Sequence, residues 1–345
     1  MSRSVAVTDL RLQRPGFTLG PLSFGVASGG RLAIVGPSGS GKTTLLRCLA
    51  GLDRPDGGAV RIGGQVVAQG ARFVPPDRRG VGLVFQDGAL WPHMTVLQHL
   101  TFAAPGLGDS AARSLLAQAG LGAHADKKPA ALSGGEAQRL GLVRALAPSP
   151  AVLLLDEPLR SVDVHQRDAM ALLLRGLADE RGLTTILVTH DRDEALALAT
   201  DLVVLRDGQL VEAGPALDLL RAPRTAFTAA FLAGAACLPT TARGDVVDTP
   251  FGPFARPTGA TGDLRLVLLP GEVRATAADD GPAGKILATT PDGAAFRVRV
   301  ALGDQIVQAT AAAPLRPGDT ARLALAVSPR LLPWQISSPA PSIRP

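Results

Sequence analysis

The chain has 345 residues, a formal net charge of +5 from 35 Lys and Arg against 30 Asp and Glu, and 3% aromatic residues. That length favours two domains. The charge is too small and scattered, and the aromatic residues are too few, to indicate nucleic-acid binding. Apolar runs are shorter than the roughly 20 residues of a membrane helix, and the N-terminus has no signal-peptide segment. Two cysteines form no disulfide framework, so we expect a cytosolic protein.

The N-terminal region predicts a phosphate-binding loop within alternating strands and helices. Strands are expected at Val5 to Leu12, Phe17 to Val26 and Arg31 to Val35, and a helix over Thr44 to Ala50 that stops at Gly51. Between the last strand and the helix lies GPSGSGKT, which fits G-x-x-x-x-G-K-[ST], a pattern whose backbone amides surround phosphates. The expected ATP-binding residues of this loop are Gly36, Pro37, Ser38, Gly39, Ser40, Gly41, Lys42, Thr43 and Thr44.

Within this loop, Lys42 supplies a compact positive charge to the phosphates, and the Thr43 hydroxyl is a ligand for Mg²⁺. The N-terminus of the following helix presents its dipole to the anion. The alternative is a flexible Gly/Ser turn without a ligand, but the surrounding strand and helix argue against it.

Two apolar strands deliver polar residues to the end of a parallel sheet. Ala151 to Leu155 ends in Asp156 and Glu157, and the strand that begins at Thr184 ends in His190. Ligands of open α/β sheets bind at this end. We expect Asp156 to orient Mg²⁺, Glu157 to polarise the attacking water, and His190 to fix that water and contact the γ-phosphate. Taken alone, each would be an ordinary strand-end residue.

Helical patterns occupy the segment from Trp91 to Lys128, where Thr95 is expected to cap a helix over Val96 to Ala103 and Ser110 a helix over Ala111 to Ala119. Further on, LSGGE precedes a helical run over Ala137 to Ala147. Its glycine-rich start is a second candidate for phosphate binding.

Together these motifs resemble the nucleotide-binding subunits of ATP-binding cassette (ABC) transporters, and LSGGE is the most specific of them. The resemblance implies a head-to-tail homodimer with two ATP sites, in which the signature of one chain completes the site of the other. The signature residues are Ser133, Gly134, Gly135 and Glu136. Gln86, after the strand Val81 to Phe85, then corresponds to the loop that contacts Mg²⁺ and senses the membrane partner.

Two further positions are expected from the resemblance. Asp163 belongs to the loop that links the two ATP sites, although Arg160 stands where the usual loop has a small residue. Phe17 is the candidate for stacking on adenine, because the chain has no Tyr, and a core role is its alternative.

The composition changes after Cys237 to short strands separated by Pro and Gly, including Asp263 to Leu269, Phe296 to Val300 and Ala321 to Val327. This region resembles the oligonucleotide/oligosaccharide-binding-like (TOBE) domain of importer ATPases. The predicted fold is therefore an α/β P-loop NTPase over residues 1–235, with a RecA-like, mostly parallel sheet, an antiparallel β subdomain and a helical lobe at about 91–144. A small all-β barrel over 236–345 follows, with a disordered tail from Ser337.

These features predict an importer ATPase at the cytoplasmic face of the inner membrane, where it binds peripherally to separate permease subunits served by an external solute-binding protein. The segment from Pro75 to Val96 most resembles ferric-iron, polyamine and sugar importers, and we expect ferric iron or a related small solute. The alternative class is a soluble cassette ATPase acting on nucleic acid or ribosomes. The single cassette and the C-terminal barrel argue against that class.

Overall fold

The computed structural model describes residues 3–86, 88–160, 162–260, 262–276, 281–328 and 330–334. Within these, residues up to Ala216 form one compact unit and residues from Leu217 form a second. Helix α7 (Ala216–Arg221) begins at the last residue before this division, and α8 (Ala226–Ala233) lies between it and residue 235. The domain boundary predicted at residue 235 stays a prediction, and the predicted tail from Ser337 lies outside the described residues.

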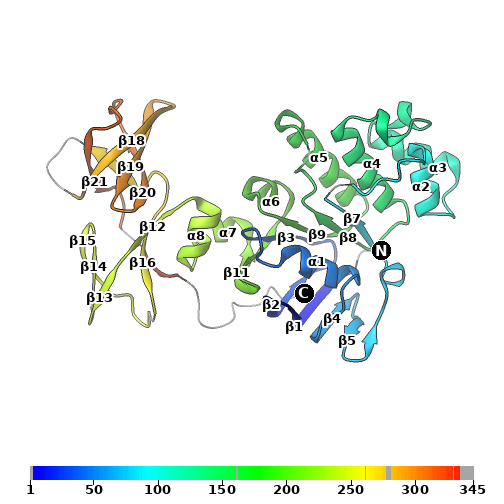
Figure 1. Ribbon diagram of the computed structural model, residues 1–345, viewed down its shortest axis with the longest axis horizontal. Helices are drawn as coiled ribbons and strands as arrows, with labels where there is room; N and C mark the ends of the chain where they lie inside the picture. The colour runs from blue at the N-terminus through cyan, green and yellow to red at the C-terminus, as the bar shows by residue number, and fades with distance from the viewer. Residues whose placement is uncertain are drawn as a thin grey trace. The chain divides into compact units, whose positions relative to one another are not determined.

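A mostly parallel sheet forms the centre of the first unit, with the strand order β11-β10-β3-β9-β8-β7 in its described residues (Figure 1). The strands are β3 (Arg31–Val35), β7 (Val81–Val84), β8 (Val152–Asp156), β9 (Thr184–Thr189), β10 (Asp201–Arg206) and β11 (Gln209–Pro215). Only β11 runs antiparallel to its neighbour. Every residue of β8 and β9 is buried, as expected for strands covered on both faces. The predicted sheet is therefore confirmed.

The predicted antiparallel subdomain is a second sheet with the order β2-β1-β4-β5-β6. Its strands are β1 (Val5–Arg14), β2 (Phe17–Val26), β4 (Gly57–Ile62), β5 (Gln65–Gln69) and β6 (Arg72–Phe73). Helix α1 (Lys42–Ala50) lies between the two sheets (Figure 1). Leu10, Leu45 and Leu154, from the subdomain, α1 and the central sheet, share one core and are at most 1% exposed. Each such side chain contributes about 1.5–3 kcal/mol, so α1 is firmly anchored.

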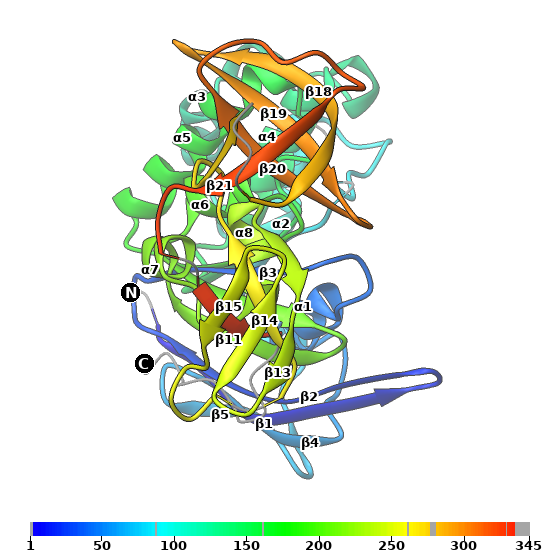
Figure 2. The ribbon, with the colours of Figure 1, turned by 90° about the vertical axis from the view of Figure 1, so that its left-hand side faces the viewer.

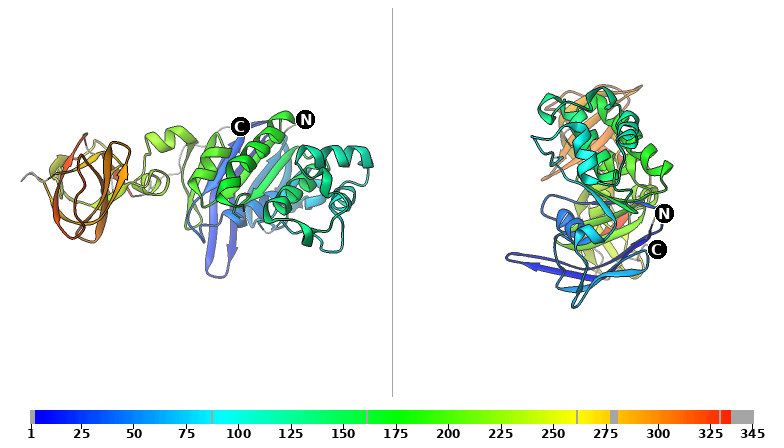
Figure 3. Two further views of the ribbon diagram at one scale, coloured as in Figure 1. Left: turned by 90° about the horizontal axis from the view of Figure 1, so that it is seen from above. Right: turned by 90° about the vertical axis from the view of Figure 1, so that its right-hand side faces the viewer.

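Helices cover the other face of the central sheet and extend into a helical lobe (Figure 3). The α-helices are α2 (Val96–Ala103), α3 (Asp109–Gln118), α4 (Gly134–Leu146), α5 (Val164–Glu180) and α6 (Arg192–Leu198). Short 3₁₀ turns occur at Pro76–Arg78, Gly122–His124 and Pro129–Ala131. The lobe has its own core, in which Leu100 of α2, Leu116 of α3 and Leu140 of α4 are fully buried.

The two predicted caps of the lobe have different outcomes. Thr95 caps α2 through a capping box with Gln98, as predicted. The cap predicted at Ser110 is wrong, because α3 begins at Asp109 after Gly108, whose extended backbone takes the cap position without a side chain. Asp109 then lies in the first turn and pairs with Arg113 at 2.9 Å, which favours the earlier start.

The second unit contains α8 and a series of short strands (Figure 2). Their bounds are β12 (Ala236–Pro239), β13 (Thr241–Arg243), β14 (Val246–Thr249), β15 (Gly252–Ala255), β16 (Leu264–Leu268), β17 (Val273–Thr276), β18 (Ala283–Asp292), β19 (Ala295–Leu302), β20 (Gln305–Ala311), β21 (Thr320–Leu325) and β22 (Arg330–Pro333). Two three-stranded sheets, β12-β16-β22 and β13-β14-β15, accompany a closed barrel, β17-β20-β19-β18-β21.

Alternating apolar residues fill the barrel, and Val298, Val300 and Leu323 are fully buried in it. The closed barrel confirms the predicted small all-β domain. Among the helices that the structure describes, none has both the length and the apolar character needed to cross a bilayer.

Candidate functional site

The phosphate-binding loop connects β3 to α1 and leaves the start of the helix open. Gly41 occupies the cap position with φ 97°, and no side chain caps the helix amides. A Cβ atom at Gly41 would lie 2.7 Å from both Phe17 Cζ and Leu19 Cδ1, so a larger residue would clash. The first turn of α1 contains no acidic residue. These amides and the helix dipole are therefore available to an anion.

Lys42 is held inside the loop and is only 7% exposed. Its Nζ donates to Gly36 O at 2.8 Å and to Pro37 O at 2.9 Å, and lies 3.5 Å from Ser40 Oγ. Burial lowers the pKa of the Lys42 amine, and the nearby carboxylates of Glu157 and Asp156 partly offset this shift. The loop carbonyls thus position the ammonium group before any phosphate binds.

A cavity of about 470 Å³ opens over the loop. The residues that line it are Phe17, Ser38, Gly39, Gly41, Lys42, Thr43, Thr44 and Glu157. Most of the predicted ATP-binding residues of the loop therefore face one space, with Phe17 at its wall. Ser40 of the loop does not line this space, because it is only 2% exposed. Gly36 and Pro37 do not line it either, and their carbonyl oxygens accept hydrogen bonds from Lys42.

Asp156 and Thr43 meet at the end of β8. Thr43 Oγ1 donates to Asp156 Oδ1 at 3.3 Å, and Asp156 is 8% exposed. Burial raises the pKa of the Asp156 carboxyl, an effect that the hydrogen bond from Thr43 reduces. A hydroxyl and a carboxylate oxygen suit Mg²⁺, which keeps several waters and phosphate oxygens as ligands. The described residues contain no cluster of three or more His, Cys, Asp or Glu that could hold a metal ion.

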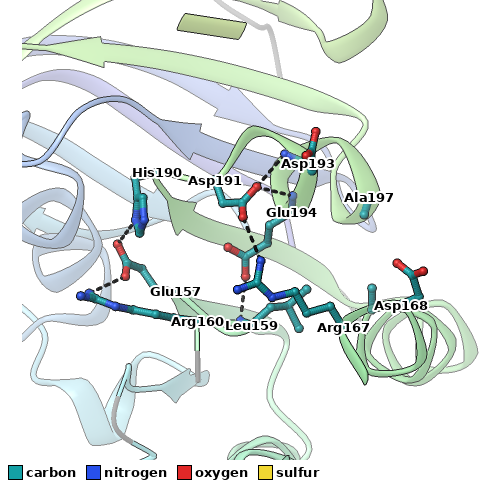
Figure 4. A pocket seen from close by; sticks show the side chains of 11 residues that line it. Glu157, Leu159, Arg160, Arg167, Asp168, His190, Asp191, Asp193, Glu194 and Ala197 are labelled. Carbon is teal, nitrogen blue, oxygen red and sulfur yellow. Dashed lines mark hydrogen bonds and ion pairs between the residues drawn. The ribbon is translucent and has the colours of Figure 1, made fainter. Parts of the chain in front are cut away.

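Glu157 is held in an unusual backbone conformation with φ 47°, and its amide donates to Val188 O of β9 at 2.9 Å. A left-handed conformation costs a non-glycine residue about 1–2 kcal/mol, and such strain concentrates at functional sites. The side chain, 13% exposed, accepts from Arg160 Nη1 at 2.8 Å through Oε2, and Oε1 lies 2.8 Å from His190 Nδ1 (Figure 4). Burial alone would raise the pKa of Glu157, but His190 and Arg160 outweigh it and the pKa is lowered. Glu157 therefore remains ionised.

Two buried polar side chains that the sequence reasoning missed fasten the loop after Glu157. Gln138 Nε2 of α4 donates to Pro158 O at 2.7 Å, and Glu194 Oε1 of α6 accepts from the Leu159 amide at 2.8 Å. The other oxygen of Glu194 accepts a hydrogen bond from Thr189, next to His190. A polar residue within each helix was the available signal, since a buried polar group requires a partner, but the sequence does not identify that partner.

Gln86 and Asp163 lie in loops beside the site. Val84 of β7 pairs with Leu155 of β8, so Gln86 and Glu157 each lie two residues beyond that pair at the same edge of the sheet. Gln86 does not line the cavity over the loop. Asp163 caps α5, and its Oδ1 accepts from the His165 amide at 2.9 Å. The register thus places Gln86 at the same end of the sheet as Asp156 and Glu157, and Asp163 makes a helix-capping contact.

The signature residues form the start of α4 and do not line the cavity over the loop of their own chain. Ser133 caps the helix, with Ser133 Oγ accepting from the Glu136 amide at 3.3 Å and Glu136 Oε2 accepting from the Ser133 amide at 2.8 Å. The bond from the Ser133 amide lowers the pKa of Glu136. Within one chain, the start of α4 is therefore not part of the cavity at the start of α1.

Comparisons with known proteins place the chain among transport ATPases. Residues 19–160 match the family model described as ABC transporter. The chain is 41% identical over 260 residues to "Fe(3+) ions import ATP-binding protein FbpC" of Mesorhizobium japonicum, covering 74% of this chain and 72% of that protein. It is 39% identical over 321 residues to the protein of the same name from Streptomyces avermitilis, covering 90% and 92% of the two chains.

A second group of relatives is named for a different solute. "Sulfate/thiosulfate import ATP-binding protein CysA" of Mycobacterium tuberculosis is 38% identical over 337 residues, covering 94% of this chain and 90% of that protein. Among solved structures, a bacterial Atm1-family ABC exporter with ATP bound matches with a TM-score of 0.57 and 30% identity, over 64% of this chain and 40% of that chain. A dimeric, post-hydrolysis ATP-binding cassette bound to ADP and Pi matches with a TM-score of 0.54 and 29% identity, over 61% and 98%. The chain therefore belongs to the ABC transporter family, as an ATP-binding and ATP-hydrolysing subunit of the import type with a C-terminal barrel domain.

Proposed function

We propose that Glu157 is the carboxylate that polarises the water attacking the γ-phosphate of ATP in the cavity over the phosphate-binding loop. The position of Glu157 supports this role, because it lines that cavity and is held in an ionised state beside His190. Lys42 and the open amides of α1 stabilise charge on the phosphates. His190 orients Glu157 and the water. A Mg²⁺ ion on the phosphates would be held by Thr43, by Asp156 through water and by Gln86, and would neutralise phosphate charge.

The proposed active form is a head-to-tail homodimer with two ATP sites. Each site would contain the phosphate-binding loop of one chain and Ser133 to Glu136 of the other. The separate positions of the signature and the cavity within one chain support this arrangement. The likeness to a dimeric cassette gives it further support.

We further propose that ATP binding and hydrolysis drive a permease made by other chains, to which this protein binds peripherally at the cytoplasmic face of the inner membrane. An external solute-binding protein would deliver the solute. Ferric iron is the preferred cargo, because the similarity to the iron-import proteins adds to the sequence resemblance. Sulfate or thiosulfate is the competing cargo, supported by a relative that covers 94% of the chain.

The decisive experiment for the catalytic assignment is Glu157→Gln. This variant should bind ATP with near wild-type affinity and lose hydrolysis by about 100-fold or more, as expected when a general base is removed. Steady-state hydrolysis and nucleotide binding of the purified chain measure both quantities. Glu180→Gln, at the exposed C-terminal end of α5, is the matched control and should hydrolyse ATP normally. Near-normal hydrolysis by Glu157→Gln would refute the assignment.

The same Glu157→Gln variant tests the partners and the cargo. Bound to ATP and isolated by a tag from solubilised membranes of the source cell, it should co-purify with a multi-span permease. Uptake of radioactive ferric iron, rather than sulfate, should then be lost in cells that carry only this variant. Co-purification with ribosomes or nucleic acid and no permease would contradict the transport assignment, and loss of sulfate uptake alone would replace iron as the cargo.

A further inference from the structure

We propose that Arg160 is a positioning residue that restrains Glu157 in the unassembled subunit and thereby limits its basal ATP hydrolysis. This inference rests on the proposed role of Glu157. In the loop that the family resemblance expects to link the two ATP sites, Arg160 stands where a small residue is usual. Its side chain forms an ion pair with Glu157.

Glu157 lies between two cavities, and both of its side-chain partners belong to the cavity without the phosphate-binding loop. That second cavity, of about 300 Å³, is lined by Arg160, His190, Arg167 and Asp191 among others (Figure 4). Among the described residues, Glu157 is the one shared by the two linings. Arg160 Nη1 binds Oε2, while His190 Nδ1 contacts Oε1, both at 2.8 Å. Each carboxylate oxygen is therefore bound by a residue that lines the cavity without the phosphate-binding loop.

Buried side chains hold the backbone at two positions of this loop, whereas the Arg160 side chain is exposed. Pro158 O and the Leu159 amide are bound by the buried side chains of Gln138 and Glu194. Arg160 itself has a side chain that is 53% exposed, and its guanidinium group forms an ion pair with the Glu157 carboxylate. Rotation of that side chain is sufficient to release Oε2, and no change of the loop backbone is needed.

Release would accompany dimer closure, because Arg160 belongs to the loop that the family resemblance expects to link the two ATP sites. Acceptors of the second chain would compete there with Glu157 for the guanidinium group, whose planar array of donors suits carboxylate and phosphate oxygens. His190 would then hold Glu157 alone, with Oε2 free to accept a proton from the attacking water. In this way the Arg160–Glu157 ion pair links hydrolysis to assembly.

The test compares Arg160→Gln, Arg160→Ser and Arg160→Lys in the full-length purified chain without permease. Exposed ion pairs contribute modestly, so the basal kcat for ATP hydrolysis at low protein concentration should rise about two- to fivefold in the Gln and Ser variants. KM for ATP should not change, because Arg160 does not line the nucleotide cavity. Arg160→Lys keeps a positive charge and should give a smaller rise. Arg175→Gln, which removes an exposed arginine of α5, is the matched control and should leave kcat unchanged.

Rates are measured across protein concentrations and extrapolated to low concentration, where the chains are unassembled; the plateau at high concentration should match that of the wild type, because dimer closure has already released Glu157 there. A low-concentration rate per chain of Arg160→Gln equal to or below that of the wild type overturns the inference, as does an equal rise in Arg160→Lys. The double variant Glu157→Gln/Arg160→Gln should be inactive. If Glu157→Gln alone is active, the proposed function fails, and this result is distinct from failure of the Arg160 inference.

Discussion

The two glycine-rich helix starts of the cassette, at α1 and at α4, differ in what occupies their amides. The start of α1 has a glycine cap, no side-chain hydrogen bond and no acidic residue in its first turn. The start of α4 is closed by the capping box of Ser133 and Glu136, which brings a carboxylate to the first turn. An anion can therefore bind α1 in a single chain, whereas at α4 it must accommodate a cap and a negative charge.

This difference indicates separate tasks for two sequences of similar composition. The loop at α1 is ready to bind nucleotide phosphate by itself, with Lys42 already positioned by backbone carbonyls. The start of α4 is stabilised without a ligand, because its own side chains accept hydrogen bonds from the Ser133 and Glu136 amides. If the signature of one chain contacts phosphate only when that phosphate is bound to a second chain, ATP hydrolysis depends on assembly of the two chains.

The largest expected effect comes from Ser133→Arg. A long cation at the start of α4 removes the cap and blocks close approach of a second chain, so hydrolysis should fall about 100-fold or more, as when a preorganised phosphate donor is lost. ATP binding to the single chain should change little, because Ser133 does not line the nucleotide cavity. Nucleotide titration and steady-state hydrolysis measure the two effects. Ser114→Arg, on the exposed surface of α3, is the control. Hydrolysis that does not fall would argue against a shared site.

The sequence predicts the parts of this comparison that depend on local patterns. Parallel strands bring their carboxyl ends to one edge, so Asp156, Glu157 and His190 were expected together, and the structure places Glu157 and His190 in contact. The ion pair of Arg160 with Glu157 and the bonds made by Gln138 and Glu194 were not expected. These contacts join residues from different elements, and their partners depend on loop conformations, such as the positive φ of Glu157, that no periodic pattern specifies.

Helix α1, which carries the open phosphate-binding start, is held at its C-terminal end by Arg79. Arg79, 1% exposed, donates to Cys48 O at 2.7 Å, to Leu49 O at 2.9 Å and to Val74 O at 2.7 Å. The bonds to Cys48 and Leu49 satisfy carbonyls at the C-terminal end of the helix. Burial lowers the pKa of Arg79 to about 10, so its charge persists at neutral pH.

Arg79→Met should therefore reduce the free energy of unfolding of the chain by about 3 kcal/mol, because buried carbonyls lose their donor. The matched control is Arg54→Met, since Arg54 also lies over Phe73 and binds two carbonyls, but at the surface. It should cost about 0.5 kcal/mol or less. Thermal and denaturant unfolding compare the two variants. Equal losses would indicate that the end of α1 does not depend on Arg79.

The smallest expected effect, from Glu136→Gln, isolates the charge at the start of α4. Glutamine keeps the capping box, so the helix should remain intact while the carboxylate near the phosphate of the second chain is removed. The KM for ATP in hydrolysis should fall about two- to fivefold, because an anion near a phosphate opposes its binding at a helix start. Asp109→Asn removes a first-turn carboxylate from α3, which lies outside the proposed site, and should leave KM unchanged. If KM stays the same or rises in Glu136→Gln, the carboxylate does not oppose phosphate binding, and the difference between the two helix starts rests on the cap alone.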